Sequence, residues 1–481
     1  MGDDSKRKDS WSAAIELKKQ IAKSTNHTSE KLLVYDKVVF EPWKHSDSFS
    51  SFPRVTYFNG HRGCNENLYA VMSRLKLNFN VVNPRNVTHY GMREIDAERL
   101  IESGYVERLC DASDVIVIAD TLPDARGILL SLVHPDESKR CKSNIVIELT
   151  NRFDWMVGNK TEYFDMIETL VDDPPRNLFW TANNPFEAHW MHAQVGKVPK
   201  IKLLRSLGAW NVEAFSDAKV NYSEKINSLA IIKNEDIIDR PIIGDILRYY
   251  CMPVKVLPKK YGGPKGLLKY KGFIEFPYQV SVMKFYENVA HGVPQIIPTP
   301  RFLRIIAQTN NHHLIRPWLD RLITTQLFLS NRTAYSEMNL KKKSKEIDGS
   351  IAKLAENYFK DLEKTNPILS RRKVGLAVKP ENRRNKNINQ KTQPEIDEGP
   401  YNAPWTDIVD FYNSEFSPFV YYFDSFAELA DLINKPWDEF DYKNVREEGP
   451  KYYASVRKQS LATWVSMFHQ MGYENIEEYV G

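Results

Sequence analysis

The sequence predicts an α/β protein with two doubly wound, parallel-sheet domains. The runs Asp114–Ala119 (DVIVIA) and Ile145–Leu149 (IVIEL) are continuously apolar, as in strands that a parallel sheet buries on both faces. Residues 273–300 read as strand, helix, glycine stop and strand, which is the pattern of a βαβ unit. A length of 481 residues with 42% hydrophobic content is enough for two ordinary domains.

In the N-terminal half, short apolar segments alternate with helical patterns. A helix is predicted over Asn65–Leu75, and a polar extension with an amphipathic helix at Trp11–Ile21 precedes the first strand. The predicted strands are Val55–Phe58, Phe79–Val82, Asp114–Ala119, Ile145–Leu149 and Leu178–Thr181. This alternation is typical of a doubly wound sheet.

The C-terminal half repeats the pattern, and we place the domain boundary near residue 195. Asp424 is predicted to cap the helix that follows the strand Pro418–Phe423. The other predicted strands are Ser228–Ile232, Val254–Leu257, 273–276 and Val293–Ile297; the other predicted helices are Ile243–Tyr250, Lys265–Lys271, one ending at His291-Gly292, and Tyr453–Met471.

Charge is unevenly distributed along the chain. The formal net charge of only +4 argues against a dedicated nucleic-acid binder, but residues 341–392 contain 15 Lys+Arg against 6 Asp+Glu. We expect an amphipathic helix over 335–365, followed by a disordered basic insertion at 366–400. The insertion is interpreted either as a solvated loop or as a contact with an anionic membrane surface.

These patterns give a domain map. It consists of a polar extension (1–50), an N-terminal domain (51–195), a C-terminal domain (196–334 with 401–450), a helix with the basic insertion (335–400) and a C-terminal helix (451–481).

The four cysteines are far apart and show no zinc-binding spacing. We therefore expect reduced, buried thiols and a cytoplasmic protein, with peripheral membrane contact through the basic insertion as the alternative. The N-terminus lacks the apolar stretch of a signal peptide, and no run approaches the ~18 apolar residues of a membrane span.

The run Tyr286–Gln295 (YENVAHGVPQ) resembles the donor-binding helix of glycosyltransferases of the GT-B class. Many retaining members have a Glu-x7-Glu motif before an Ala-x-Gly-x-Pro turn, and the second Glu holds the nucleotide ribose. Glu287 matches that second position, whereas the first falls on Gln279, so retaining and inverting chemistry both stay open. More widely, residues 53–310 and 405–476 resemble a poorly characterised group of fungal GT-B-like proteins.

This resemblance implies two facing Rossmann-like domains and a C-terminal helix that braces the N-terminal domain. It implies transfer of a sugar from a nucleoside-diphosphate donor to the hydroxyl of a glycan, lipid or protein, in an interdomain cleft and without a cofactor. The sequence contains no D-x-D triplet, which agrees with metal-independent transfer in which helix dipoles and basic side chains neutralise the leaving group.

Candidate site residues fall into two groups. The resemblance assigns the donor to Gln279, Ser281 as helix cap, Met283, Lys284 and Glu287, with Lys265 after the YGGP loop beside the base or phosphates. The acceptor is expected at the carboxyl ends of the first sheet's strands. There we select His61 as general base and Asp120, lined by Asn59, Gly60, Asn151, Arg152 and Asn183. Asp120 is equally a candidate helix cap, and a lone histidine is often structural.

Two alternative functions stay open: a catalytically silent GT-B-like protein that binds nucleotide sugars, and a nucleotide-sugar epimerase. No G-x-G-x-x-G fingerprint follows the first strand, and neither a P-loop nor a G-x-S-x-G elbow occurs. These absences argue against a dinucleotide-dependent dehydrogenase, a P-loop NTPase and an α/β-hydrolase.

Overall fold

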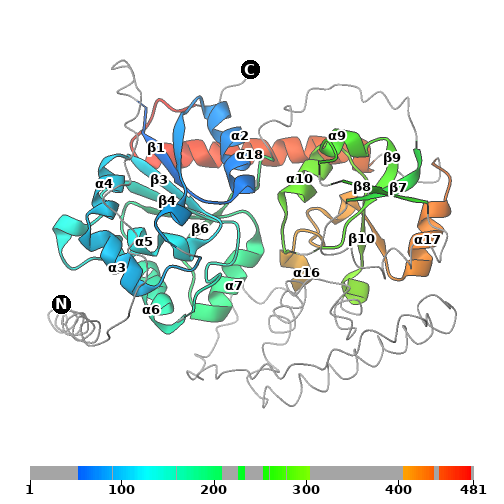
Figure 1. The fold of residues 1–481 in the computed structure, drawn as a ribbon. Coiled ribbons are helices and arrows are strands. Elements are labelled where there is room, and N and C mark those ends of the chain that lie inside the picture. Colours follow the sequence, from blue (N-terminus) through cyan, green and yellow to red (C-terminus); the bar gives the residue numbers. More distant parts are fainter. Residues whose placement is uncertain are drawn as a thin grey trace, which may run out of the picture. The chain divides into compact units, whose positions relative to one another are not determined.

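The computed structural model describes residues 52–208 except His89 and Asn159, 226–232, 253–303 except Lys259 and Tyr278, 405–437 and 444–477. These residues form two parallel β-sheets with helices between the strands, ending in a long C-terminal helix (Figure 1). The predicted α/β fold class with two Rossmann-like sheets is therefore confirmed. The helices expected at Trp11–Ile21, Ile243–Tyr250 and 335–365, and the basic insertion at 366–400, lie outside the described residues.

The first sheet has six strands in the order β2-β1-β3-β4-β5-β6. Strand β1 pairs in parallel with both β2 and β3, and β3 pairs in parallel with β4. All residues of β1 and β3 are buried, as their apolar sequences require. The strands are β1 (Val55–Phe58), β2 (Phe79–Val82), β3 (Val115–Ala119), β4 (Asn144–Leu149), β5 (Leu178–Ala182) and β6 (Ile201–Leu203).

Helical segments connect these strands. The α-helices are α2 (Arg62–Leu75), α3 (Glu94–Glu102), α4 (Tyr105–Asp111), α5 (Arg126–Leu132), α6 (Lys160–Asp172) and α7 (Pro185–Val195), and the 3-10 turns are η2 (Pro84–Asn86), η3 (Leu122–Ala125) and η4 (Glu137–Lys139). The sequence prediction placed all five strands β1 to β5 and α2, but it did not name the other helices or β6.

The second sheet has five strands in the order β11-β10-β9-β7-β8, and its pairs are also parallel. The strands are β7 (Ile226–Ile232), β8 (Val254–Leu257), β9 (Tyr270–Ile274), β10 (Gln295–Pro298) and β11 (Val420–Phe423). The helical segments are α9 (Pro264–Leu267), α10 (Met283–Ala290), α16 (Trp405–Ile408), η7 (Ser417–Phe419), α17 (Phe426–Asn434), the π-helix η9 (Asn444–Glu448) and α18 (Gly449–Gln470). Helix α18 packs against α10 and α2.

Two local predictions in this half were wrong. The helix predicted over Lys265–Lys271 is only the short α9, because Tyr270 already begins the buried strand β9 between β7 and β10. The cap of α17 is Ser425, whose side chain accepts the Glu428 N–H, and not Asp424. Asp424 instead binds the guanidinium of Arg301.

The chain divides into two compact units, unit 1 (residues 1–61 and 77–180) and unit 2 (62–76 and 181–481). The division after residue 180 falls earlier than the boundary expected near 195, and it assigns α2 to unit 2. Among the described residues, no helix is both long and apolar enough to cross a membrane.

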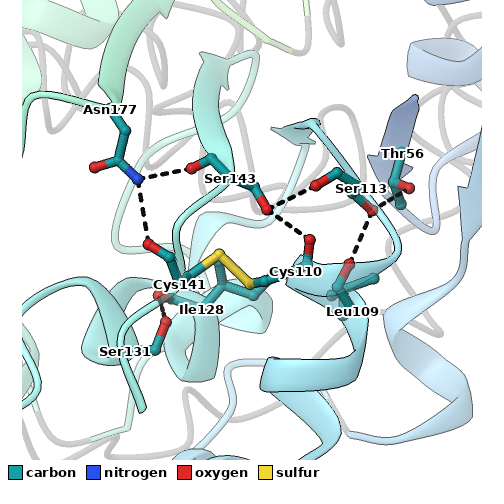
Figure 2. The surroundings of a disulfide bond; sticks show 9 residues. All are labelled: Thr56, Leu109, Cys110, Ser113, Ile128, Ser131, Cys141, Ser143 and Asn177. Carbon is teal, nitrogen blue, oxygen red and sulfur yellow. Dashed lines mark hydrogen bonds between the residues drawn. A yellow bond between two sulfur atoms is a disulfide. The ribbon is translucent and has the colours of Figure 1, made fainter. Parts of the chain in front are cut away.

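A disulfide joins Cys110, at the end of α4, to Cys141, in the segment before β4 (Figure 2). Its surroundings are hydrogen-bonded: Ser143 Oγ lies 2.9 Å from the carbonyl oxygens of both Cys110 and Ser113, and Asn177 Nδ2 donates to the Cys141 carbonyl at 3.2 Å. The expectation of reduced thiols is therefore wrong for these two residues. The cysteines consequently give no argument for a reducing compartment. Cys64 is buried, and Cys251 lies outside the described residues.

Candidate functional site

In unit 1, the structure brings together the two residues selected as catalytic candidates. Asp120 directly follows β3, and His61 lies in the turn after β1, so both stand at the carboxyl edge of the sheet. A ring nitrogen of His61 and a carboxylate oxygen of Asp120 lie within 4.8 Å of each other. His61 is exposed and Asp120 is half-buried, so solvent or a substrate can reach the pair.

The pair supplies an imidazole nitrogen and a carboxylate oxygen. It can work in proton transfer, and the same two atom types are ligands that zinc accepts. The sequence placed these residues on the loops after the first and third strands, and the fold makes those two strands neighbours in the sheet.

Asp120 is held in an uncommon backbone conformation. Its φ of +63° lies in the left-handed region, where non-glycine residues are rare. The Asp120 N–H donates to Thr150 Oγ1 at 3.0 Å, and Thr121 Oγ1 donates to the Asp120 carboxylate at 3.2 Å. These contacts fix the carboxylate at the end of β3, and conformations of this kind cluster at functional sites. No side chain of Asp120 caps η3, whose N-cap is Thr121.

The Asn59 side chain holds the backbone of His61 in place. Its side chain donates to the His61 carbonyl at 2.7 Å and accepts the His61 N–H at 3.1 Å, while Asn59 itself is 1% exposed. These two contacts shape the turn that carries His61, and the cleft role of Asn59 stays a prediction. Gly60 is exposed in that turn, and a side chain there would place Cβ 2.9 Å from Asn83 Oδ1.

Asn151 and Arg152 begin the loop after β4, and both are half-buried. The Asn151 side chain accepts the Arg152 N–H at 3.1 Å, and the Arg152 guanidinium lies 5.1 Å from the Trp155 ring centroid. They share the carboxyl edge of the sheet with the His61–Asp120 pair.

In unit 2, α10 carries two of the donor-site candidates, Lys284 and Glu287. Lys284 Nζ lies 2.6 Å from a carboxylate oxygen of Glu275, and it also covers the Phe273 ring at 4.9 Å. Burial raises the pKa of Glu275, although the charge of Lys284 opposes that change. Because this ion pair already uses its charge, Lys284 is a weaker candidate for a phosphate ligand than its sequence position suggests.

Glu287 lies against the backbone of Gly208. A Cβ at Gly208 would be 3.1 Å from Glu287 Cγ, and the Gly208 φ of +91° also favours glycine. Burial raises the pKa of the Tyr261 phenol, and the negative charges of Glu287 and Glu275 raise it further. Tyr261, in the YGGP loop, is therefore a neighbour of both carboxylates. Sequence reasoning cited that loop but not this residue.

Lys265 is exposed, and its charge affects His291, the residue that follows α10. Burial lowers the pKa of His291, and the positive charges of Lys265 and Arg457 lower it further. The Glu287 carbonyl, which accepts a hydrogen bond from the His291 ring, opposes this change. Lys265 thus belongs to the same cluster as Glu287.

The remaining donor-side candidates, Met283 and Gln279, are half-buried at and before the start of α10. The prediction that Ser281 caps α10 was wrong, since Val282 occupies the N-cap without a side-chain bond. Ser281 Oγ instead lies 2.8 Å from the Tyr286 hydroxyl.

That hydroxyl belongs to a buried network centred on Arg205. Arg205 Nη1 lies 2.5 Å from Asp410 and donates to the Asn183 carbonyl at 3.1 Å, while Nη2 binds Glu415. Tyr286 donates to Asp410. Asn183, selected as a cleft residue, contributes its backbone to this network. Sequence reasoning missed Arg205; the one available signal was Asp410, a lone carboxylate between Val409 and Phe411.

Comparisons with known proteins add little. No protein-family model matches the chain, and no curated protein matches it. Among solved structures, it is similar to UDP-GlcNAc 2-epimerase from Methanocaldococcus jannaschii, with 11% identity and a TM-score of 0.30 over 56% of this chain and 91% of that chain. A likeness this low carries no argument about function.

Proposed function

We propose that this protein is a glycosyltransferase of the GT-B type, which transfers a sugar from a nucleoside-diphosphate donor to a hydroxyl acceptor. The observation that carries the proposal is the His61–Asp120 pair, with a ring nitrogen and a carboxylate oxygen within 4.8 Å at the carboxyl edge of the unit 1 sheet. That edge is where doubly wound sheets place their ligands.

The pair suits activation of a hydroxyl. Neutral His61 takes the proton of the acceptor hydroxyl, and the oxygen attacks the anomeric carbon of the donor sugar. The bond from that carbon to the diphosphate breaks, and the nucleoside diphosphate leaves with the electron pair. Asp120 stabilises the imidazolium that forms, which is how a carboxylate supports a histidine base.

In this proposal, residues of unit 2 bind the nucleotide. The Glu287 carboxylate accepts hydrogen bonds from ribose hydroxyls, and the phosphates lie toward the free N–H groups at the start of α10, beside Met283. Lys265, exposed in the same cluster, adds a positive charge for the nucleotide. The likeness of the Glu287 segment to GT-B donor helices supports this assignment. No resident cofactor is needed, because the nucleotide sugar is a substrate.

The test uses the full chain with a panel of UDP- and GDP-sugars, and it measures release of the nucleoside diphosphate and identifies the sugar product. We expect His61→Ala to slow release by about 10²-fold or more, the usual contribution of a positioned base, with the affinity for nucleotide unchanged. The matched control is His469→Ala, which removes an exposed histidine on α18.

Asp120→Asn is the companion variant, because asparagine also tolerates the left-handed conformation that this position requires. It should slow turnover without weakening nucleotide binding. Wild-type turnover in His61→Ala would contradict the proposal. Nucleotide binding without any turnover would identify a silent binding protein, and an epimerised nucleotide sugar as product would identify an epimerase.

A further inference from the structure

The loops at the carboxyl edge of the unit 1 sheet are tied to one another. The loop after β1 approaches the loop after β2, since a Cβ at Gly60 would lie 2.9 Å from Asn83 Oδ1 and 3.8 Å from Arg85 Cγ. The loop after β3 reaches the same segment through buried Asp124, which pairs with Arg85 and accepts the Gly91 N–H at 2.9 Å. The surface built by these loops is thus continuous with the His61–Asp120 pair.

Arg85 and Tyr90 form a stacked pair on this surface. The guanidinium carbon lies 3.4 Å from the centroid of the Tyr90 ring, yet Tyr90 is 55% exposed. An aromatic ring this exposed gains little from burial, whereas the guanidinium holds it in one orientation. The arrangement therefore presents a pre-oriented ring to solvent.

Met156 extends this surface from the loop after β4. It is 53% exposed and has a φ of +63°, and Gly91 packs directly on it: a Cβ at Gly91 would lie 2.1 Å from the Met156 carbonyl oxygen. A long apolar side chain is thus held in solvent by a backbone conformation that is unfavourable for methionine. Tyr90 and Met156, attached to adjoining backbone, are among the few large apolar side chains that the described part of unit 1 exposes this far.

We propose that Tyr90 and Met156 form a stacking surface for a saccharide acceptor, beside the His61–Asp120 pair. This inference rests on the proposed function and narrows its acceptor class. A sugar ring has a C–H face that packs on an aromatic ring and a rim of hydroxyls that bind nearby polar groups. In this proposal the exposed Tyr90 ring and Met156 thioether contact the C–H face of the sugar, and polar groups of the adjoining loops bind its hydroxyls.

Charge and size favour a neutral sugar over a lipid or an acidic ligand. The positive charge of Arg85 is balanced by Asp124, which it contacts directly, so Arg85 beneath the Tyr90 ring adds little net charge for a phosphate or carboxylate. Two exposed apolar side chains cover the area of one or two rings, far less than an extended acyl chain needs.

The proposal is tested by binding of the labelled full-length protein to an array of neutral oligosaccharides, followed by affinity measurement for the best glycan. Tyr90→Ala should weaken that affinity by about tenfold or more, while Tyr90→Trp should retain it. Tyr69→Ala is the matched control, since Tyr69 is also an exposed tyrosine at 43% but lies on α2.

Met156→Gly provides a second variant that should not compromise folding, because glycine favours the positive φ at this position. It should also weaken glycan binding. The inference is overturned if the wild-type protein binds no saccharide, if it binds lipid vesicles or peptides instead, or if Tyr90→Ala and Met156→Gly both bind glycan like the wild type.

The two proposals fail in different ways. Donor turnover onto an acceptor that is not a saccharide would overturn the stacking surface and leave the transferase function standing. Tyr90-dependent glycan binding without donor turnover would support the surface and overturn the transferase function.

Discussion

At the residue scale, single side chains here act chiefly by fixing their neighbours. Asn59 holds the His61 backbone from both sides, and Thr121 and Thr150 hold Asp120. In unit 2, the absence of a side chain at Gly208 makes room for Glu287. Such supporting residues determine whether a candidate group is correctly oriented.

Glu287 should contribute directly to nucleotide affinity. Glu287→Ala removes a charged hydrogen bond to the ribose, which is worth about 1.5–3 kcal/mol. Isothermal titration with UDP and GDP measures the loss, and Glu474→Ala, an exposed glutamate after α18, is the control. Unchanged affinity in a folded Glu287→Ala protein would rule out the ribose contact.

Asp114 should make stability depend on pH below the ordinary range of a carboxyl. Burial alone would raise its pKa, but hydrogen bonds from the side chain and backbone of Arg54, at 2.7–3.1 Å, and the charge of Arg54 lower it overall. Since the folded-state pKa is below the unfolded value of about 3.9, the contribution is complete above roughly pH 4 and is lost as pH falls through the folded-state pKa.

Melting temperatures between pH 5 and pH 2.5 test this. Asp114→Asn should lower the melting temperature at pH 5 and give a shallower decline toward acid, whereas Asp431→Asn, an exposed position on α17, should behave like the wild type. An equally steep acid decline in Asp114→Asn would show that Asp114 is not responsible.

At the element scale, tertiary contacts override local preference in several places. Residues 265–271 have a helical pattern, but the chain leaves the helix after Leu267 because β9 completes the sheet between β7 and β10. Gly272 within β9 permits close approach to β10, since a Cβ there would lie 2.8 Å from Ile296 Cδ1. The hydrogen bonds of the ladder are available only once β7 and β10 are in place.

The disulfide links the end of α4 to the segment before β4 and should stabilise unit 1. It joins residues 31 positions apart. In the chain-entropy model, closing a loop of this length lowers the entropy of the unfolded chain and so stabilises the folded state by about 3–4 kcal/mol. Cys110→Ala with Cys141→Ala should lower the free energy of unfolding by that order in urea denaturation under non-reducing conditions.

Peptide mapping provides the independent check. Both cysteines should become alkylated in the denatured wild-type protein only after reduction. Alkylation of Cys110 and Cys141 without reductant would show that the bond does not form, and an unchanged denaturation midpoint in the double variant would show that it does not stabilise the fold.

At the scale of the whole molecule, two units repeat one architectural plan and divide the proposed chemistry between them. Unit 1 carries the His61–Asp120 pair and unit 2 carries the Glu287 cluster. Within unit 2, the Arg205 network joins segments distant in sequence: Asn183 after β5, Tyr286 on α10, and Asp410 with Glu415 after α16.

Loss of Arg205 should strongly destabilise unit 2. Arg205 is 4% exposed and Asp410 0%, so Arg205→Ala leaves a buried carboxylate without its cation, at a cost of about 3–5 kcal/mol. Pairing the change as Arg205→Met with Asp410→Leu should recover part of that stability, because the fully buried Asp410 charge is then absent and only the half-buried Glu415 loses its cation. Chemical denaturation measures both variants, and an Arg205→Ala protein as stable as the wild type would show that the network is not structurally important.

Chelation by EDTA tests whether the proposed sugar transfer needs a metal ion. With helix N–H groups and Lys265 as the proposed neutralising groups, EDTA should leave nucleoside-diphosphate release largely intact. Inactivation by EDTA and restoration by Zn²⁺ or Mn²⁺ would mean that a metal ion takes part, with His61 and Asp120 as the first ligands to examine by substitution.

By itself, the sequence determined the fold class, the strands β1 to β5 and β7 to β11 to within a few residues, and the helices α2, α10 and α18. Apolar runs and glycine stops are local signals, because they depend on neighbouring residues in the sequence and not on distant partners. The sequence also singled out His61, Asp120 and Glu287, because residues just past parallel strands, or on the helix of a βαβ unit, occupy places that topology favours for ligands.

Only the tertiary structure decided which of these residues lie close together and which partner each one binds. Distances between loops after different strands depend on strand order, which no local pattern encodes, so the approach of His61 to Asp120 could not be read in advance. The same holds for the Lys284–Glu275 ion pair, the Arg205 network and the Cys110–Cys141 bond. Each joins groups whose nearness is a property of the folded chain, because local sequence fixes φ, ψ and burial preference but leaves long-range partners to packing.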